Sequence, residues 1–118
     1  MTEAELQQQS ALILEGEWTG QAPWPGRSDG AQRGTIAVSR QLSGSLEGAV
    51  VQVLRPPAGR PVSSSDLEFR RGDRGLWFLK AAPGEAKGVF IVDHPQRFLR
   101  DAPENAAELK AWHERLKR

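Results

Sequence analysis

The stretch from residue 72 to residue 98 constrains the fold of this chain more than any other part of the sequence. Two short apolar runs that contain aromatic residues, 76–80 and 88–92, lie on either side of a turn with Pro83 and Gly84. Apolar runs of this length around a Pro-Gly turn are typical of two antiparallel strands joined as a β-hairpin. The stretch therefore predicts a β-rich domain, although its residues indicate no particular chemistry.

Two further segments, residues 12–19 and 34–42, alternate between two faces with a period of two, which is typical of strands buried on one face. A third segment, residues 49–54, is rich in β-branched side chains and is strand-like for that reason. Residues 21–33 are rich in proline and glycine, and they predict a long loop between the first two of these strands. The apolar positions predict a core of Leu12, Leu14, Ile36, Val38, Val51, Val53, Phe78, Phe90 and Val92.

A helix is expected at each end of the chain. Thr2 and Glu5 have the spacing of a capping box, which predicts a short helix over residues 3–9 with little apolar surface. Asp101 is the expected N-cap of a longer helix over residues 103–117. The apolar residues of this second helix recur at helical spacing and are Ala106, Leu109, Trp112 and Leu116. We therefore expect the C-terminal helix to pack on the strands through these side chains.

The predicted elements indicate one domain that spans residues 1–118, because a chain of this length builds a single core. Five strands in an open sheet would leave long edges that invite pairing with other chains, and closure into a barrel removes them. We therefore expect a mainly β fold with flanking helices. Its centre is a five-stranded, OB-like Greek-key barrel, with the C-terminal helix packed on it.

Four short motifs follow one another along the chain. Residues 10–17 read SALILEGE, residues 42–44 read LSG, residues 72–79 read GDRGLWFL and residues 95–98 read PQRF. In this order they resemble the strand motifs of a broad group of small bacterial domains, which are often secreted and mostly uncharacterised. The resemblance spans residues 10–98. It implies an OB-like barrel and export, and it implies no activity and no catalytic residues.

Several classes of protein are excluded by composition and segment length. The chain contains no cysteine, so disulfides, thiolate nucleophiles and cysteine metal sites are absent. The longest apolar runs, residues 12–14 and 76–79, are much shorter than the ~20 residues of a membrane span. The polar residues 1–5 do not have the form of a signal peptide. We expect a soluble protein, either exported with its leader outside this sequence or cytoplasmic.

The residue types that support catalysis are sparse, so we expect no enzyme, no cofactor and no bound metal. His94 lies at a predicted strand end and is expected to cap a turn, while His113, on the C-terminal helix, is expected on the surface or at the boundary between surface and core. Glu15 and Glu17 share one strand face, and their alternation with apolar residues is typical of a solvent-exposed face. The chain has no cluster of metal-ligand residues and no glycine-rich phosphate loop.

Two groups of residues are candidates for binding. Trp24 lies between two prolines in a polar loop, where an indole is costly unless it packs against something or binds a partner. Its alternative role is to cap one end of the barrel. Arg70, Arg71 and Arg74 form a basic cluster just before the hairpin. With an exposed aromatic residue, this cluster would bind single-stranded nucleic acid as OB domains do.

Two functions therefore remain open. The first is a non-enzymatic binding or protein-interaction module whose partner is a protein or a small surface ligand. The alternative is an OB-type single-stranded nucleic-acid-binding domain that uses Arg70, Arg71 and Arg74. A net charge of only +1 favours the first, because nucleic-acid-binding domains usually carry a stronger basic excess. The sequence determines neither the partner nor the oligomeric state.

Overall fold

The computed structural model describes residues 2–46, 48–56, 69–85 and 88–117. Its strands are β1 (Leu12–Pro23), β2 (Gln32–Ser43), β3 (Val50–Arg55), β4 (Arg74–Ala81), β5 (Val89–Ile91) and β6 (Phe98–Arg100). Its α-helices are α1 (Glu3–Gln8) and α2 (Ala106–Leu116). Two 3₁₀ turns, η1 (Pro95–Arg97) and η2 (Pro103–Asn105), precede β6 and α2.

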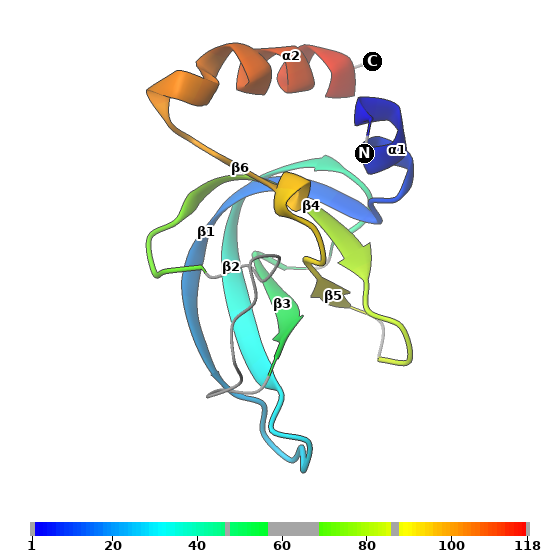
Figure 1. The fold of residues 1–118 in the computed structure, drawn as a ribbon, viewed down its shortest axis with the longest axis vertical. Helices are drawn as coiled ribbons and strands as arrows, with labels where there is room; N and C mark the ends of the chain where they lie inside the picture. The colour runs from blue at the N-terminus through cyan, green and yellow to red at the C-terminus, as the bar shows by residue number, and fades with distance from the viewer. Residues whose placement is uncertain (1, 47, 57–68, 86–87, 118) are drawn as a thin grey trace.

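Five of the strands close into a barrel (Figure 1). The β1–β2, β2–β3, β4–β5 and β1–β4 pairs are antiparallel, and a parallel β3–β5 pair completes the ring. This arrangement confirms the predicted OB-like barrel. The predicted hairpin is the β4–β5 pair, which is short, with Lys80 opposite Ile91 and Ala81 opposite Phe90. The sixth strand, β6, pairs with the first half of β4 and was not predicted.

Alternate residues of the strands fill the barrel interior, as a period of two requires. This interior cluster consists of Leu12, Leu14, Trp18, Ile36, Val51, Val53, Trp77, Leu79, Phe90 and Val92. Trp77 is fully buried, and its indole N–H donates a hydrogen bond to the carbonyl oxygen of Gly16 at 2.9 Å. Val38 was predicted in the core but is only half-buried. It lies just beyond Ala37, the last β2 residue that is paired with β3, where the barrel wall ends.

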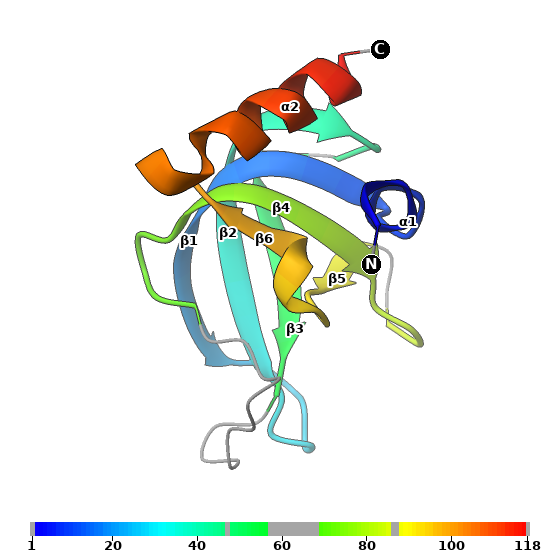
Figure 2. The same ribbon diagram turned by 45° about the horizontal axis from the view of Figure 1, so that its top comes forward.

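The outer face of β1 and β4 is also apolar, and the two helices lie over it (Figure 2). The cluster beneath the helices consists of Leu6, Ile13, Leu76, Phe78 and Trp112. Leu109 and Leu116 of α2 pack against this cluster, which confirms the predicted packing of the helix. Phe78 is therefore buried as predicted, but under the helices and not inside the barrel. Ile13 alternates with the inward-facing residues, and the same helices bury it.

A capping residue was predicted for each helix, and the prediction is confirmed for α1 but not for α2. There the Thr2 hydroxyl accepts a hydrogen bond from the Glu5 N–H at 3.1 Å, as a capping box requires. The prediction that Asp101 caps the C-terminal helix is wrong. The Asp101 N–H donates to the Arg74 carbonyl oxygen at 2.8 Å and so continues the β6–β4 ladder. The chain then makes the turn η2, and α2 begins at Ala106.

A buried arginine, Arg97, ties η1 to the segments beneath it. Its side chain is only 1% exposed. The Nε atom donates to Asp93 Oδ1 at 2.6 Å, and Nη1 donates to the Phe78 carbonyl oxygen at 3.2 Å and to Ser10 Oγ at 3.3 Å. These bonds join segments that are far apart in the chain, and no sequence pattern indicated them.

Candidate functional site

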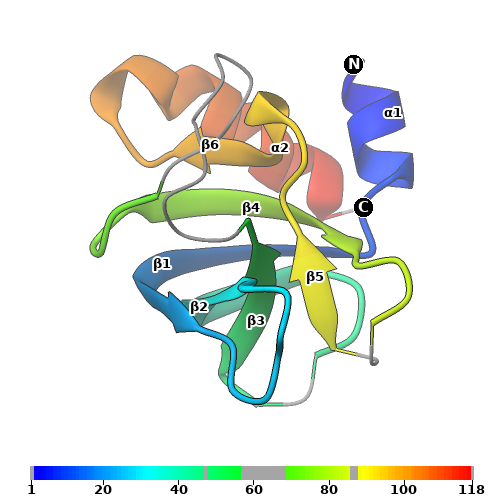
Figure 3. The same cartoon turned by 60° about the horizontal axis from the view of Figure 1, so that its bottom comes forward.

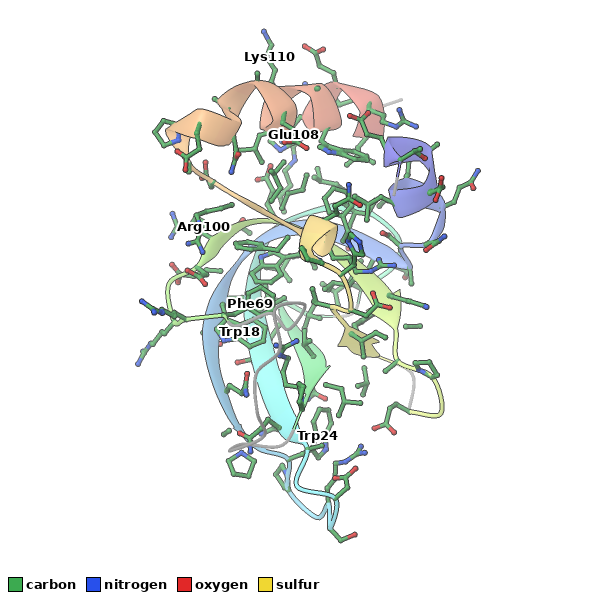
Figure 4. All side chains as sticks on the ribbon, in the orientation of Figure 1. Trp18, Trp24, Phe69, Arg100, Glu108 and Lys110 are labelled. Atoms are coloured by element: carbon green, nitrogen blue, oxygen red, sulfur yellow. The ribbon has the colours of Figure 1, made fainter. Side chains whose placement is uncertain are left out.

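The two groups of predicted binding residues lie at different places on the barrel. Trp24 is at the tip of the β1–β2 hairpin, at the lower end of the molecule in Figure 4. Arg70 and Arg71 belong to the turn that leads into β4, and Arg74 is the first residue of that strand; this turn lies higher and on one side in Figures 1 and 2. The structure therefore does not bring the two groups together.

The 70–74 turn is held by the carboxylate of Asp73. Its Oδ2 atom accepts from the Arg70 N–H at 2.9 Å, and its Oδ1 atom accepts from Arg100 Nη1 at 2.7 Å. Arg70, Arg71 and Arg74 are all exposed, and Arg74 forms an ion pair with Glu17 at 3.1 Å. The positive charge of the predicted cluster is therefore partly offset by acidic neighbours.

Aromatic rings are close to this turn, but they pack against one another. Trp18, Phe69, Trp77 and Phe98 form a continuous stack with ring centroids 4.1 to 5.8 Å apart. Trp18 and Trp77 are fully buried, and Phe69 and Phe98 are half-buried. The Arg55 guanidinium lies over the Phe69 ring at 5.1 Å. Each ring of this stack is at least half-buried, so none of them offers the exposed flat face on which a nucleic-acid base stacks.

The Asp73 carboxylate makes the stability of the turn dependent on pH. Burial pushes the pKa of Asp73 up, but hydrogen bonds from Arg100 and the Arg70 N–H outweigh this and hold it below its usual value. Since the folded-state pKa is lowered, the stabilisation is present above the unfolded value of about 3.9 and is lost as the pH falls toward the folded value. We expect the unfolding free energies of the native chain and Asp73→Asn to differ most at neutral pH and to converge in acid. Carboxyl NMR that finds Asp73 titrating at or above its usual value would contradict this expectation.

The loop that carries Trp24 is shorter than predicted. Ala22 pairs with Arg33 and Pro23 pairs with Gln32, so the β1–β2 ladder continues into the stretch expected to be a loop. β1 pairs with β4 only from Leu12 to Glu17, so Pro23 lies where this side of β1 is a sheet edge in the described part of the chain, and a proline is tolerated there. The tip is residues 24–31, and it is closed by a hydrogen bond from the Trp24 N–H to the Ala31 carbonyl oxygen at 3.0 Å.

Charged side chains surround the half-buried Trp24 ring. The guanidinium groups of Arg27 and Arg33 lie 5.9 Å and 5.7 Å from its centroid. Arg27 also forms ion pairs with Asp29, at 2.7 Å, and with Glu85 in the β4–β5 connection. The hairpin tip is therefore fastened to a segment that lies far away in the sequence. We call Trp24, Arg27, Asp29, Arg33 and Glu85 the Trp24 cluster.

The charges of the Trp24 cluster balance one another. Hydrogen bonds from the Arg27 side chain and the Ala31 N–H lower the pKa of Asp29 to about 2. The hydrogen bonds that Asp29 and Glu85 accept raise the pKa of Arg27 above its usual value. The Arg27–Asp29 pair is therefore fully ionised at neutral pH. Two arginines face two carboxylates in this cluster, so it has no excess of positive charge.

The outward-facing side chains of β2 and β3 form a surface next to the Trp24 cluster. Cross-strand neighbours on this surface are Arg33 with Leu54, Thr35 with Gln52, and Ala37 with Val50. We call these six residues the β2–β3 face. In Figure 3, α1 and α2 lie beyond β1 and β4, away from β3, so the helices leave this face uncovered. Val50 is 55% exposed and is the one large exposed hydrophobic residue in the described part of the chain.

The two histidines lie in different places: His94 is at the start of η1, whereas His113 of α2 faces Glu15 of β1. His94 caps η1, where its Nδ1 atom accepts a hydrogen bond from the Gln96 N–H at 3.1 Å. Glu15 was expected on a solvent-exposed face, which is wrong. Its carboxylate is half-buried and forms an ion pair with His113 of α2. The helix covers this part of β1, and the alternation along the strand does not reveal that.

No protein-family model matches the chain, and no curated protein matches it either. Among the described residues, no three His, Asp or Glu side chains are arranged to hold a metal ion. The described helices also lack the length and apolar character that a membrane crossing needs.

The sequence indicates Trp24 as a candidate binding residue, but it does not indicate Arg27, Arg33 or Glu85. The proline-flanked indole is a local signal. The contact between Arg27 and Glu85 spans 58 positions and depends on how the barrel closes. No pattern within either loop predicts it.

Proposed function

We propose that this protein is a binding module that holds a segment of a partner protein on the β2–β3 face, with Trp24 as an anchor. One observation carries the proposal: a half-buried indole is held at the edge of a sheet face that the helices leave uncovered. Tryptophan is enriched among the residues that dominate protein interfaces, because it combines a large apolar area with a polar N–H.

The character of the neighbouring surface supports a protein partner. The cluster around Trp24 is balanced in charge, and the face beside it combines Val50 and Leu54 with the polar side chains of Thr35 and Gln52. Interface centres are depleted in charged residues, and the β2–β3 face holds only one, Arg33, whereas nucleic-acid sites depend on an excess of Lys and Arg. OB-like barrels also commonly bind on this face, between the β1–β2 and β4–β5 loops.

The alternative is single-stranded nucleic-acid binding through Arg70, Arg71 and Arg74. Its support is the exposure of Arg70 and Arg71 on one turn. Against it, Arg74 is paired with Glu17, and the rings of the neighbouring stack are at least half-buried. We therefore prefer the protein partner.

A phage-displayed library of random peptides, selected on the native chain and counter-selected on Trp24→Ala, tests the proposal. We expect the selected peptides to bind Trp24→Ala at least ~10-fold more weakly than the native chain, since Trp anchors typically cost more than ~1.4 kcal/mol when truncated. The matched control is Glu114→Ala on the exposed side of α2, which should leave peptide affinity unchanged.

Peptides that bind both variants equally, or no enrichment over the counter-selection, would contradict the proposal. The same proteins are tested with labelled single-stranded oligonucleotides at ~0.15 M salt, where a domain of low net charge gains little from counterion release. We expect no binding near micromolar concentration. Binding at that level, abolished by changing Arg70, Arg71 and Arg74 together to alanine, would establish the alternative instead.

A further inference from the structure

The β2–β3 face contains one charged side chain, Arg33 of β2. This side chain is half-buried, and its guanidinium lies over the Trp24 ring, 5.7 Å from the ring centroid. Among the described residues, no carboxylate lies within ion-pair distance of Arg33. A guanidinium over an aromatic ring still presents its N–H donors in the plane of the group, so Arg33 retains donors for an acceptor that approaches the face.

The two carboxylates of the Trp24 cluster are both engaged by its other arginine. Asp29 lies 2.7 Å from the Arg27 guanidinium, and Glu85 pairs with the same group. The cluster is therefore neutral as a whole, but its charges are not paired one to one. Arg33 contributes a positive charge at the face that no carboxylate of the cluster contacts.

A partner that covers the β2–β3 face removes water from Arg33. Withdrawing an unpaired charge from water is costly, and the cost is offset only when an opposite charge and its hydrogen bonds replace the water. A carboxylate does this well, because it accepts two parallel charge-assisted hydrogen bonds from one guanidinium. Arg33 therefore requires a carboxylate from whatever binds over it.

The remaining residues of the face determine how far a second contact lies from this carboxylate. Arg33 lies opposite Leu54, and Ala37 lies opposite Val50, four residues further along β2. Four residues of a strand span about 13 Å. Side chains four positions apart in an extended peptide lie on the same side and have this same separation. Val50 is 55% exposed, so this end of the face offers an apolar contact.

We propose that the partner segment is an extended peptide with an acidic side chain over Arg33 and, four residues away, an aliphatic side chain over Val50. This inference rests on the proposed function and adds the chemistry of the bound segment. A carboxylate suits the site better than the phosphates of a nucleic acid. The reason is that Asp29 and Glu85, at the Arg33 end of the face, repel a chain of negative charges, and the Val50 end is apolar.

Phage-displayed libraries of peptides about twelve residues long test the proposal. In the first library, glutamate and leucine are fixed four positions apart, in both orders, and all other positions are random. The second library has glutamine in place of the glutamate. The third has the leucine only three positions from the glutamate, which turns it to the opposite side of an extended chain.

Selection on the native chain should yield about tenfold more binding clones from the first library than from either of the others. The preference for glutamate over glutamine reflects the charge-assisted hydrogen bonds to Arg33. It should vanish on Arg33→Gln and persist in part on Arg33→Lys, which keeps the charge but not the planar fork. Arg40→Gln is the matched control, because Arg40 is an exposed arginine of the same strand beyond its pairing with β3. It should leave the preference unchanged.

Dissociation constants of one selected peptide, measured in its glutamate and glutamine forms, isolate the contact with Arg33. Replacing the glutamate should weaken binding to the native chain and to Arg40→Gln about tenfold, and binding to Arg33→Gln less than about twofold. A loss of equal size in the native chain and in Arg33→Gln would overturn the inference.

The outcomes separate this inference from the proposed function. Equal yields from the glutamate and glutamine libraries, with peptides that still lose affinity for Trp24→Ala, would overturn the inference and leave the proposed function in place. Peptides that bind Trp24→Ala as well as they bind the native chain would contradict both. Oligonucleotide binding that Arg33→Gln abolishes would assign this arginine to a phosphate and would also overturn the inference.

Discussion

Phe78→Ala is expected to lower the free energy of unfolding by about 3–5 kcal/mol, the usual cost of truncating a buried phenylalanine. The ring is 1% exposed and its centroid is 4.7 Å from that of Trp112. It also lies in the cluster that attaches both helices to the barrel. Its loss would leave a cavity at the centre of that attachment. Chemical denaturation followed by circular dichroism measures the effect.

Val50→Ala is the matched control, because Val50 is the exposed hydrophobic residue of β3 and its truncation should change the unfolding free energy by less than ~0.5 kcal/mol. A loss below ~1 kcal/mol for Phe78→Ala would contradict the burial of this ring. Hydrogen exchange adds a second measurement. The amides of α2 should exchange faster in Phe78→Ala, because Trp112 then loses its main aromatic contact.

Arg97→Ala is expected to cost about 3 kcal/mol, from a cavity and from the loss of hydrogen bonds to buried groups. The guanidinium is almost completely buried and donates to the Phe78 carbonyl oxygen at 3.2 Å. Asp93, by contrast, is 42% exposed, so water can solvate its carboxylate when Arg97 is removed. Most of the cost should therefore come from the buried carbonyl and the lost packing. Thermal and chemical unfolding measure it.

A surface arginine provides the control for Arg97. Arg115 is 41% exposed and lies 3.6 Å from Glu3, so Arg115→Ala should cost less than ~1 kcal/mol. Arg97→Met restores the apolar stem without the donors, and it should recover only the packing part of the loss. Equal stabilities of Arg97→Ala and Arg115→Ala would show that the buried arginine contributes nothing beyond a surface ion pair.

Most of the strands could be predicted from local patterns. Alternation identified β1 and β2, a run of β-branched residues identified β3, and the Pro-Gly turn identified the β4–β5 hairpin. β6 was missed because three residues are too few for a period of two to stand out. The start of α2 was misplaced because Asp101, a good capping residue by type, is used in the ladder with β4.

The candidate sites were less predictable than the fold. Trp24 could be identified because an indole between two prolines is unusual in a polar loop. Its neighbours Arg27 and Glu85 come from two different connections, which meet only when the barrel closes. The ion pair of Glu15 with His113 was missed for the same reason, since these two residues come from opposite ends of the chain.

The sequence by itself determined which residues share a face. A period of two along a strand and a period of 3.6 along a helix follow from backbone geometry, so they can be read without knowing the fold. What covers each face was decided only by the tertiary structure. Ile13 and Glu15 lie on the same side of β1, yet α1 and α2 bury the first, and α2 pairs the second with His113. Such contacts depend on where distant segments meet after the barrel closes, and local periodicity contains no information about that.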